Sequence, residues 1–170
     1  GSSTLAAFQG RGHRITCFDL PTRANRRLAK RMPTDVRMCW GDIRQVSDIA
    51  AAVVNQEVVV HLVAIIPELS HTGERSEDKP DAAYQVNVVG MKNLVSALQA
   101  MPVPASIVFT STLHVYGLTQ HLAPPRSVHD PVKPVEHYAQ HKVACEALLR
   151  ESGLRWTVLR LGAAIPIQLV

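Results

Sequence analysis

Short segments of almost continuous apolar character alternate along this chain with longer segments whose apolar residues recur at helical spacing. The short segments are rich in β-branched residues, and Gly, Pro or polar residues bound each of them. They predict strands at 14–18, 36–40, 58–62, 106–110 and 156–161, and the longer segments predict helices at 4–9, 23–31, 45–55, 81–100 and 135–151. Continuously apolar strands are typical of a parallel sheet covered on both faces. The alternation therefore predicts an α/β fold with a doubly wound parallel sheet, formed by residues 1–170 as one domain.

Two polar connections are longer than packing of the elements requires. Residues 67–80 follow the third predicted strand, and residues 117–134 follow the fourth. Both leave the carboxyl ends of strands, which is the edge where open α/β sheets bind ligands. Long loops in compact domains are usually functional or disordered, and their placement at this edge favours a functional role for both.

Composition narrows the class of protein. The 46% hydrophobic and 19% charged fractions are those of a folded globular protein, and exclude a disordered or collagen-like chain. The net charge of +4 permits anionic ligands without indicating nucleic acid. The basic stretch 23–31 lacks interleaved aromatic residues, which favours a solvated helix face over a nucleic-acid surface.

Cysteine usage and hydropathy bear on the compartment. Cys17, Cys39 and Cys145 form no CxxC pair, which favours reduced core thiols in the cytoplasm over a disulfide framework or a metal site. The longest apolar run, near 58–66, is too short to cross a bilayer, and the first residues do not look like a secretion signal. We therefore expect a cytoplasmic location and no membrane partner.

The candidate catalytic residues lie near the second long loop. Tyr138 and Lys142 are four residues apart in a predicted helix, so they share one face. A phenol titrates near pH 10, and a neighbouring ammonium lowers that pKa toward a useful range for proton transfer. Hydroxyls at 110–112 end the fourth predicted strand, where they can bond a substrate oxygen. Taken alone, the Tyr–Lys pair fits an ordinary helix surface better than a catalytic site.

His137 and His141 have the i, i+4 spacing of zinc-binding helices. The sequence places no third ligand near them, so we expect no metal site. The alternative role for His141 is to line the active site.

Seven short motifs complete the pattern, and their order is more specific than any one of them. They are Phe18-Asp19-Leu20, Gly41-Asp42-Ile43, His61-Leu62-Val63-Ala64, Asn87-Val88-Val89-Gly90, Phe109-Thr110-Ser111-Thr112, Val115-Tyr116-Gly117, and Tyr138 with Lys142. In this order the sequence resembles the extended short-chain dehydrogenase/reductases, also called the NAD-dependent epimerase/dehydratase family. The resemblance implies a Rossmann-like fold and an NAD(P)-dependent enzyme.

The resemblance also implies how the cofactor is held. Asp19 would bind the adenosine ribose hydroxyls, and Asp42 with Ile43 would form the turn that reads the adenine. The backbone at Leu62 and Ala64 would line the cofactor. Two of these residues have simpler alternatives, because Asp19 is also suited to cap a helix and Asp42 to form a turn.

By the same resemblance, Thr112, Tyr138 and Lys142 form the catalytic set. The register with the Val-Tyr-Gly that follows places Thr112, and not Ser111, at the catalytic hydroxyl. Tyr138 would exchange a proton with the substrate oxygen while NAD exchanges a hydride with the same carbon. Lys142 would lower the pKa of Tyr138 and, with it, contact the nicotinamide ribose. Asn87 is expected to be structural.

A carboxylate at position 19 would repel a 2′-phosphate and so favours NAD over NADP. Three arginines that could bind this phosphate follow closely, so NADP remains an alternative; they are Arg23, Arg26 and Arg27. The alternatives to an NAD-dependent oxidoreductase or epimerase are an NADP-dependent reductase of a non-sugar carbonyl compound, and a dinucleotide-binding protein without turnover.

The sequence departs from the family pattern at both ends. Gly1 stands where the third glycine of the phosphate-binding GxxGxxG would be, so the first strand and its turn are expected to precede it. That strand is central in the family sheet, and without it two strand edges lack partners. The substrate region is expected to follow Val170.

Two further departures concern the substrate. Ala163 replaces an asparagine of nucleotide-sugar enzymes, and Leu113 with His114 replace the acidic pair of the family's dehydratases. A sugar dehydratase is therefore disfavoured and a nucleotide-sugar epimerase is weakened, whereas a simple carbonyl reductase or an alcohol dehydrogenase gains support. The family also implies a homodimer formed through the helices predicted at 81–100 and 135–151.

Overall fold

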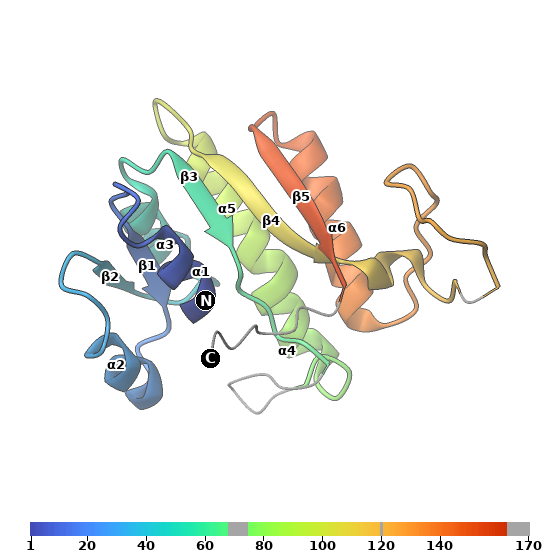
Figure 1. Cartoon of the computed structure of the whole chain (residues 1–170), viewed down its shortest axis with the longest axis horizontal. Helices are drawn as coiled ribbons and strands as arrows, with labels where there is room; N and C mark the ends of the chain where they lie inside the picture. The colour runs from blue at the N-terminus through green and yellow to red at the C-terminus, as the bar shows by residue number, and fades with distance from the viewer. Residues whose placement is uncertain (68–74, 120, 163–170) are drawn as a thin grey trace.

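The computed structural model describes residues 1–67, 75–119 and 121–162, and its ribbon is drawn in Figure 1. The strands are β1 (Thr16–Asp19), β2 (Arg37–Trp40), β3 (Val58–His61), β4 (Ser106–Thr112) and β5 (Trp156–Leu161). The α-helices are α1 (Ser2–Phe8), α2 (Arg23–Ala29), α3 (Val46–Val53), α4 (Pro80–Tyr84), α5 (Gly90–Gln99) and α6 (His137–Glu151). All five predicted strands are present, so the order of elements follows the hydrophobic pattern.

The strands form two parallel sheets. β1 pairs with β2, and β4 lies between β3 and β5. Within the described residues β1 and β3 do not pair, and each therefore has one edge without a neighbouring strand. This is the interruption that the sequence predicts at the centre of the sheet.

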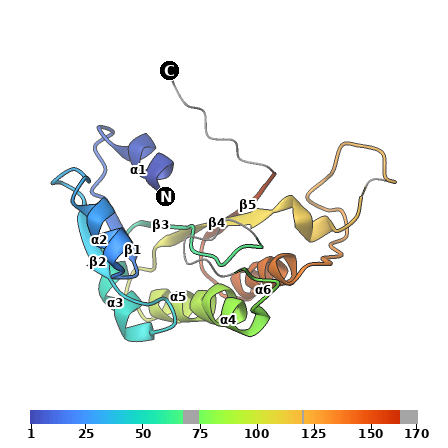
Figure 2. The same ribbon diagram turned by 90° about the horizontal axis from the view of Figure 1, so that it is seen from below.

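The helices fall on two sides of the strands. Figure 2 shows α3, α4, α5 and α6 along one side and α1 on the opposite side. The core lies between the first group of helices and the strands, where the buried side chains include Met91, Leu98, Ile107, Phe109 and Leu149. Burial of these large apolar groups is the main term that holds α5 and α6 against β4.

The other face of β3–β4–β5 differs from the prediction of a sheet covered on both faces. Leu159 and Leu161 alternate with the inward-facing side chains of β5 and are 42% and 43% exposed. In the part of the chain that the structure describes, the packed core lies only on the α5 and α6 side of these strands. The continuous apolar residues of the strands predicted more cover on this face than the described residues provide.

The predicted helix at 81–100 is divided into three parts. A π-helical turn, Gln85–Val89, separates α4 from α5. Such turns are common at functional sites. Gly90 follows the turn, and a Cβ there would lie 2.8 Å from Ile43 Cγ2, so glycine allows α5 to approach the segment after β2 closely.

Candidate active site

The Tyr–Lys pair meets the end of β4. Lys142 Nζ donates a hydrogen bond to the carbonyl oxygen of Thr110 at 2.7 Å. The same nitrogen lies 5.4 Å from the ring centre of Tyr138 and 4.6 Å from that of Phe109. Lys142 therefore joins the helix that carries Tyr138 to the strand that ends at Thr112.

Lys142 is unusual because it is a buried ammonium, with 3% of its surface exposed. Burial lowers its pKa to about 8, since the charged form is the one that loses hydration. At neutral pH most molecules still carry the charge. It is stabilised there by the Thr110 carbonyl and by the faces of two aromatic rings.

The pKa of Tyr138 moves in the direction opposite to the prediction. Burial raises it above its ordinary value, and the nearby Cys145 thiol raises it further. The expected lowering by Lys142 is absent because the ammonium lies over the ring and bonds a backbone carbonyl. Within the described residues no hydrogen bond joins Nζ to the phenol oxygen. The phenol is therefore neutral at pH 7 and is a proton donor in this state.

The hydroxyls of Ser111 and Thr112 have different partners. Ser111 Oγ is buried and donates to Glu146 Oε1 at 2.7 Å. Thr112 Oγ1 accepts a hydrogen bond from the His114 amide at 3.2 Å, where β4 passes into the 3₁₀ turn Leu113–Tyr116. Because that bond uses a lone pair, the hydroxyl proton of Thr112 remains to be donated. This difference supports Thr112 as the hydroxyl that meets a substrate.

An exposed contact between a histidine and a glutamate bridges the same two segments at the surface. His114 Nδ1 lies 3.0 Å from Glu136 Oε2, and Glu136 is the residue before α6. The Thr112 segment and the start of the Tyr138 helix are thus connected at the rim as well as in the interior.

A cleft lies between the ends of β1 and β2 and the segment after β3. Its lining residues are Phe18, Asp19, Leu20, Gly41, Asp42, Ile43, Arg44, Val63 and Val86. Asp19, Asp42 and Ile43, which the sequence places at the cofactor, meet here. Leu62 and Ala64 flank Val63 in the chain but are not part of the lining. The sequence did not single out Phe18, Leu20, Arg44 or Val86 as binding residues.

Asp19 does not cap a helix. Thr22 is the N-cap of α2, and its Oγ1 accepts from the Asn25 amide at 3.1 Å. Asp19 Oδ1 accepts from the Leu20 amide at 2.8 Å and from Asn25 Nδ2 at 3.0 Å, which holds the carboxylate at the cleft. The capping alternative for Asp19 is therefore wrong.

Asp42 does form a turn, as its simpler alternative predicts. Its Oδ1 accepts from the Arg44 amide at 2.9 Å, and its Oδ2 accepts from Arg44 Nη2 at 2.5 Å. The hydrogen bond from the Arg44 side chain lowers the pKa of Asp42 in spite of partial burial. The carboxylate is ionised at neutral pH, and its oxygens already accept hydrogen bonds from the Arg44 guanidinium.

Asn87 holds backbone beside the site, as predicted. Its Oδ1 accepts from the Ile65 amide at 2.7 Å and its Nδ2 donates to the Ile65 carbonyl at 2.8 Å. Its Nδ2 also lies 3.3 Å from Nδ1 of the buried His141, whose ring meets Tyr84 edge to face. Asn87 thus fixes the segment after β3 against the π-helical turn and α6.

One polar cluster in the interior went unrecognised in the sequence. Glu146, one turn after Lys142, accepts from Arg160 Nη2 at 2.7 Å and Nε at 3.0 Å. Arg160 Nη1 donates to Tyr116 Oη at 2.7 Å, and Tyr116 donates to the Ser127 carbonyl at 2.9 Å. Burial raises the pKa of Glu146, but the bonds from Arg160 and Ser111 lower it by more. The cluster ties α6, β5 and the loop 117–134 together.

Other expectations concern metals, membranes and the carboxyl end. Across residues 1–67, 75–119 and 121–162, no three His, Cys, Asp or Glu side chains are grouped to hold a metal ion. No helix in those residues is long and apolar enough to span a bilayer. Cys17 and Cys39 are half-buried and Cys145 is buried, all as free thiols. Ala163 lies outside the described residues.

Comparison with known proteins gives consistent matches. The model of the NAD dependent epimerase/dehydratase family matches residues 1–165. A UDP-glucose 4-epimerase of Rhizobium leguminosarum bv. trifolii is 31% identical over 166 residues, which cover 94% of this chain and 47% of that relative.

Solved structures give the same picture. The UDP-glucose 4-epimerase of Thermus thermophilus in complex with NAD has a TM-score of 0.75 and 26% identity, over 94% of this chain and 50% of that one. The Bordetella bronchiseptica enzyme WbmH in complex with NAD⁺ has a TM-score of 0.77 and 24% identity, over 94% and 52%. These likenesses confirm the predicted fold class. The chain spans about half the length of these relatives.

Proposed function

Since the chain belongs to the NAD-dependent epimerase/dehydratase family, we propose that it is the cofactor-binding and proton-transferring part of an oxidoreductase or epimerase. The enzyme moves a hydride at a hydroxyl or carbonyl carbon of a small substrate. The observation that carries the proposal is the hydrogen bond from Lys142 Nζ to the Thr110 carbonyl. It fixes the helix bearing Tyr138 against the end of the strand bearing Thr112.

The residues of the cleft fit the adenosine half of NAD. A ribose presents hydroxyl donors, and Asp19 is a carboxylate acceptor at the cleft. The apolar side chains of Phe18, Val63 and Val86 suit a flat base. Bound NAD would supply the hydride acceptor at its nicotinamide ring.

The chain's own residues would handle the proton. The neutral phenol of Tyr138 donates to a substrate carbonyl oxygen in the reducing direction, and its anion accepts the proton in the oxidising direction. The hydroxyl of Thr112 donates a hydrogen bond to the same oxygen and holds it in place. The ammonium of Lys142, through its bond to the Thr110 carbonyl, holds the helix that carries Tyr138 against the end of β4 during the transfer.

The position of Asp19 supports NAD as the preferred cofactor. A carboxylate at the ribose end of the cleft repels a 2′-phosphate. Of the three arginines that follow, Arg26 lies 5.2 Å over the Trp40 ring and donates to the Pro21 carbonyl, so part of its bonding capacity is used. Arg23 and Arg27 are exposed and are the residues that would bind the 2′-phosphate of NADP.

The relatives support a nucleotide sugar as the substrate class, because several of them are named as 4-epimerases of such sugars. A second candidate, the reduction of a simple carbonyl compound, is favoured by Leu113 and His114. These residues leave the catalytic hydroxyl without an acidic neighbour.

The test uses the full-length protein with NAD or NADP, and with UDP-hexoses or simple alcohols as hydride donors. We expect a UDP-hexose to reduce NAD faster than NADP. Thr112→Val removes the hydroxyl at nearly constant volume and should lower kcat about 100-fold. Thr157→Val, an exposed position on β5, is the matched control and should leave kcat unchanged. Binding of NAD without its reduction by any donor would instead identify a dinucleotide-binding protein without turnover.

A further inference from the structure

The first turn of the Tyr138 helix lacks a cap from its own chain neighbours. The N-cap residue of α6 is Glu136, and its side chain makes no capping hydrogen bond. The first amides of any helix have no partner inside the helix. In α6 these amides belong to His137 and Tyr138, so the proton-transferring residue lies in the part of the helix that most readily frays.

A carboxylate from a distant part of the chain satisfies both amides. Glu77 Oε2 accepts from the His137 amide at 3.2 Å, and Oε1 accepts from the Tyr138 amide at 3.1 Å. Glu77 precedes α4 and is separated from Tyr138 by 61 positions. A negative charge at a helix N-terminus is also stabilised by the helix dipole.

The Glu77 carboxylate is itself held in place by the neighbouring Ser76. Ser76 Oγ donates to Glu77 Oε1 at 3.2 Å, and the fully buried Ser76 bonds the Ile66 carbonyl through its amide at 3.1 Å. The neighbouring Ile65 is bonded through both backbone groups to Asn87. Through Ser76, Glu77 is therefore connected to the backbone at Ile65 and Ile66, and the same segment lines the cofactor cleft at Val63.

The protonation state of Glu77 suits this role. Burial raises its pKa, but hydrogen bonds from the amides of Tyr138 and His137 and from Ser76 lower it by more. The side chain is thus an ionised acceptor for both amides at neutral pH.

We propose that Glu77 is a positioning residue for Tyr138. The inference rests on the proposed function, since it assigns Glu77 to the same proton transfer. Glu77 fixes the backbone of Tyr138 relative to the segment that lines the cofactor cleft, and so sets where the phenol stands with respect to the carbon that exchanges the hydride. A loss of this contact shifts the phenol without removing any group that touches substrate. Misplacement of about 1 Å is enough to slow such a reaction by about 100-fold.

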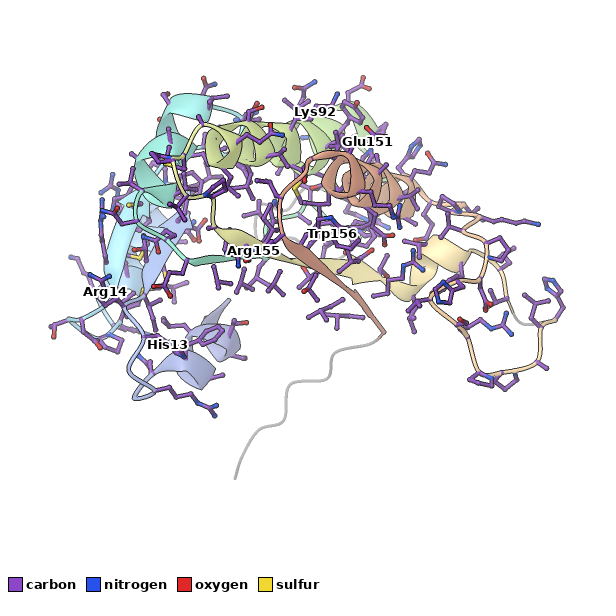
Figure 3. The ribbon with its side chains drawn as sticks, turned by 90° about the horizontal axis from the view of Figure 1, so that it is seen from above. His13, Arg14, Lys92, Glu151, Arg155 and Trp156 are labelled. Atoms are coloured by element: carbon purple, nitrogen blue, oxygen red, sulfur yellow. The ribbon has the colours of Figure 1, made fainter. Side chains whose placement is uncertain are left out.

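The experiment compares Glu77→Ala and Glu77→Gln in the full-length protein. The matched control is Glu151→Ala, which removes an exposed glutamate that points outward from the far end of the same helix (Figure 3). We expect Glu77→Ala to lower kcat about 10-fold to 100-fold, with KM and the Kd for NAD within about twofold of the control. Glu77→Gln keeps one acceptor oxygen and should recover part of the rate.

Amide hydrogen exchange gives a second measurement that does not depend on turnover. In Glu77→Ala the amides of His137 and Tyr138 should exchange faster, while those from Gln140 onward, which bond to backbone carbonyls one turn earlier, keep their protection. The proposal is overturned if kcat per folded molecule matches Glu151→Ala, or if exchange at Tyr138 is unchanged. It is also overturned if the whole helix loses protection, because Glu77 would then serve only stability. Failure of the proposed function appears separately, as a wild-type protein that never reduces NAD.

Discussion

Lys142 is the residue on which the site depends most, because its single ammonium contacts three parts of it. It bonds the end of β4, lies over the Tyr138 ring and lies over the Phe109 ring. Burial of this charge has a cost in stability that depends on pH. Its folded pKa of about 8 lies below the ordinary value of 10.5, so the unfolded chain binds more protons between these two values.

The first prediction follows from that difference. The free energy of unfolding of wild type, relative to Lys142→Met, should rise as pH increases from about 8 to about 10.5. The gain is at most about 3 to 4 kcal/mol, because one pKa unit corresponds to about 1.4 kcal/mol. Urea unfolding of both proteins across this range measures it. A difference that stays constant with pH would mean that Lys142 is charged and hydrated throughout.

For individual residues, the sequence predicts which side chains share a helix face better than it predicts their pKa values. The i, i+4 relation of Tyr138 and Lys142 is visible in the chain, as is the turn at Asp42. The direction of the Tyr138 pKa was wrong, because burial and the choice of the Thr110 carbonyl as partner depend on tertiary packing. Glu77 was missed for a related reason: no local pattern connects two residues that are 61 positions apart.

Among the elements, α6 is the one whose placement decides the site, and two acidic residues hold it. Glu77 bonds its first turn, and Glu146 joins its middle to β4 and β5 through Ser111 and Arg160. Both contacts come from elements that are distant in sequence. The orientation of Tyr138 is therefore a property of the packed sheet and not of the helix alone.

The second prediction concerns Glu146. Glu146→Ala leaves Arg160 without its carboxylate and Ser111 without its acceptor, so we expect a loss of about 3 kcal/mol in the free energy of unfolding at pH 7. The loss should shrink as pH falls below the ordinary carboxyl value of 4.5. The pKa of Glu146 is lowered in the folded state, and its stabilisation disappears once it is protonated. Glu151→Ala is the control, with an expected change within about 0.5 kcal/mol.

Urea unfolding at several pH values measures both parts of this prediction. An equal loss for Glu146→Ala and Glu151→Ala would show that the buried cluster contributes nothing to stability. A loss that does not change toward acidic pH would instead assign the effect to packing alone.

At the same scale, strands and helices were predictable because their apolar periodicity is strong, and the strand Trp156–Leu161 has the predicted bounds. Two features were not. The predicted helix at 81–100 contains a π-helical turn, where Asn87 bonds the backbone of Ile65. β4 also extends to Thr112 rather than ending at 110, because its pairing with β5 continues to Leu161. Both features depend on a partner that is remote in the chain.

For the whole molecule, the parallel arrangement and its central interruption follow from the order of elements and the family motifs. The strands are found in two pieces, β1–β2 and β3–β4–β5. Within the described residues, cover on both faces was not found at β5, where Leu159 and Leu161 are exposed on one face. Continuous apolar strands cannot distinguish one covered face from two when the covering elements come from elsewhere in the sequence.

The central claim for the whole molecule is that a buried ammonium, a phenol and a strand-end hydroxyl act together on a hydride-exchanging substrate. A single-turnover experiment with the full-length protein tests it most directly, by following the appearance of reduced nicotinamide after substrate is mixed with the NAD-loaded protein. Tyr138→Phe should slow this step about 1,000-fold while the Kd for NAD stays near its wild-type value. Tyr84→Phe, a tyrosine on the neighbouring α4, should react as fast as wild type. Reduction of NAD by Tyr138→Phe at the wild-type rate would contradict the account.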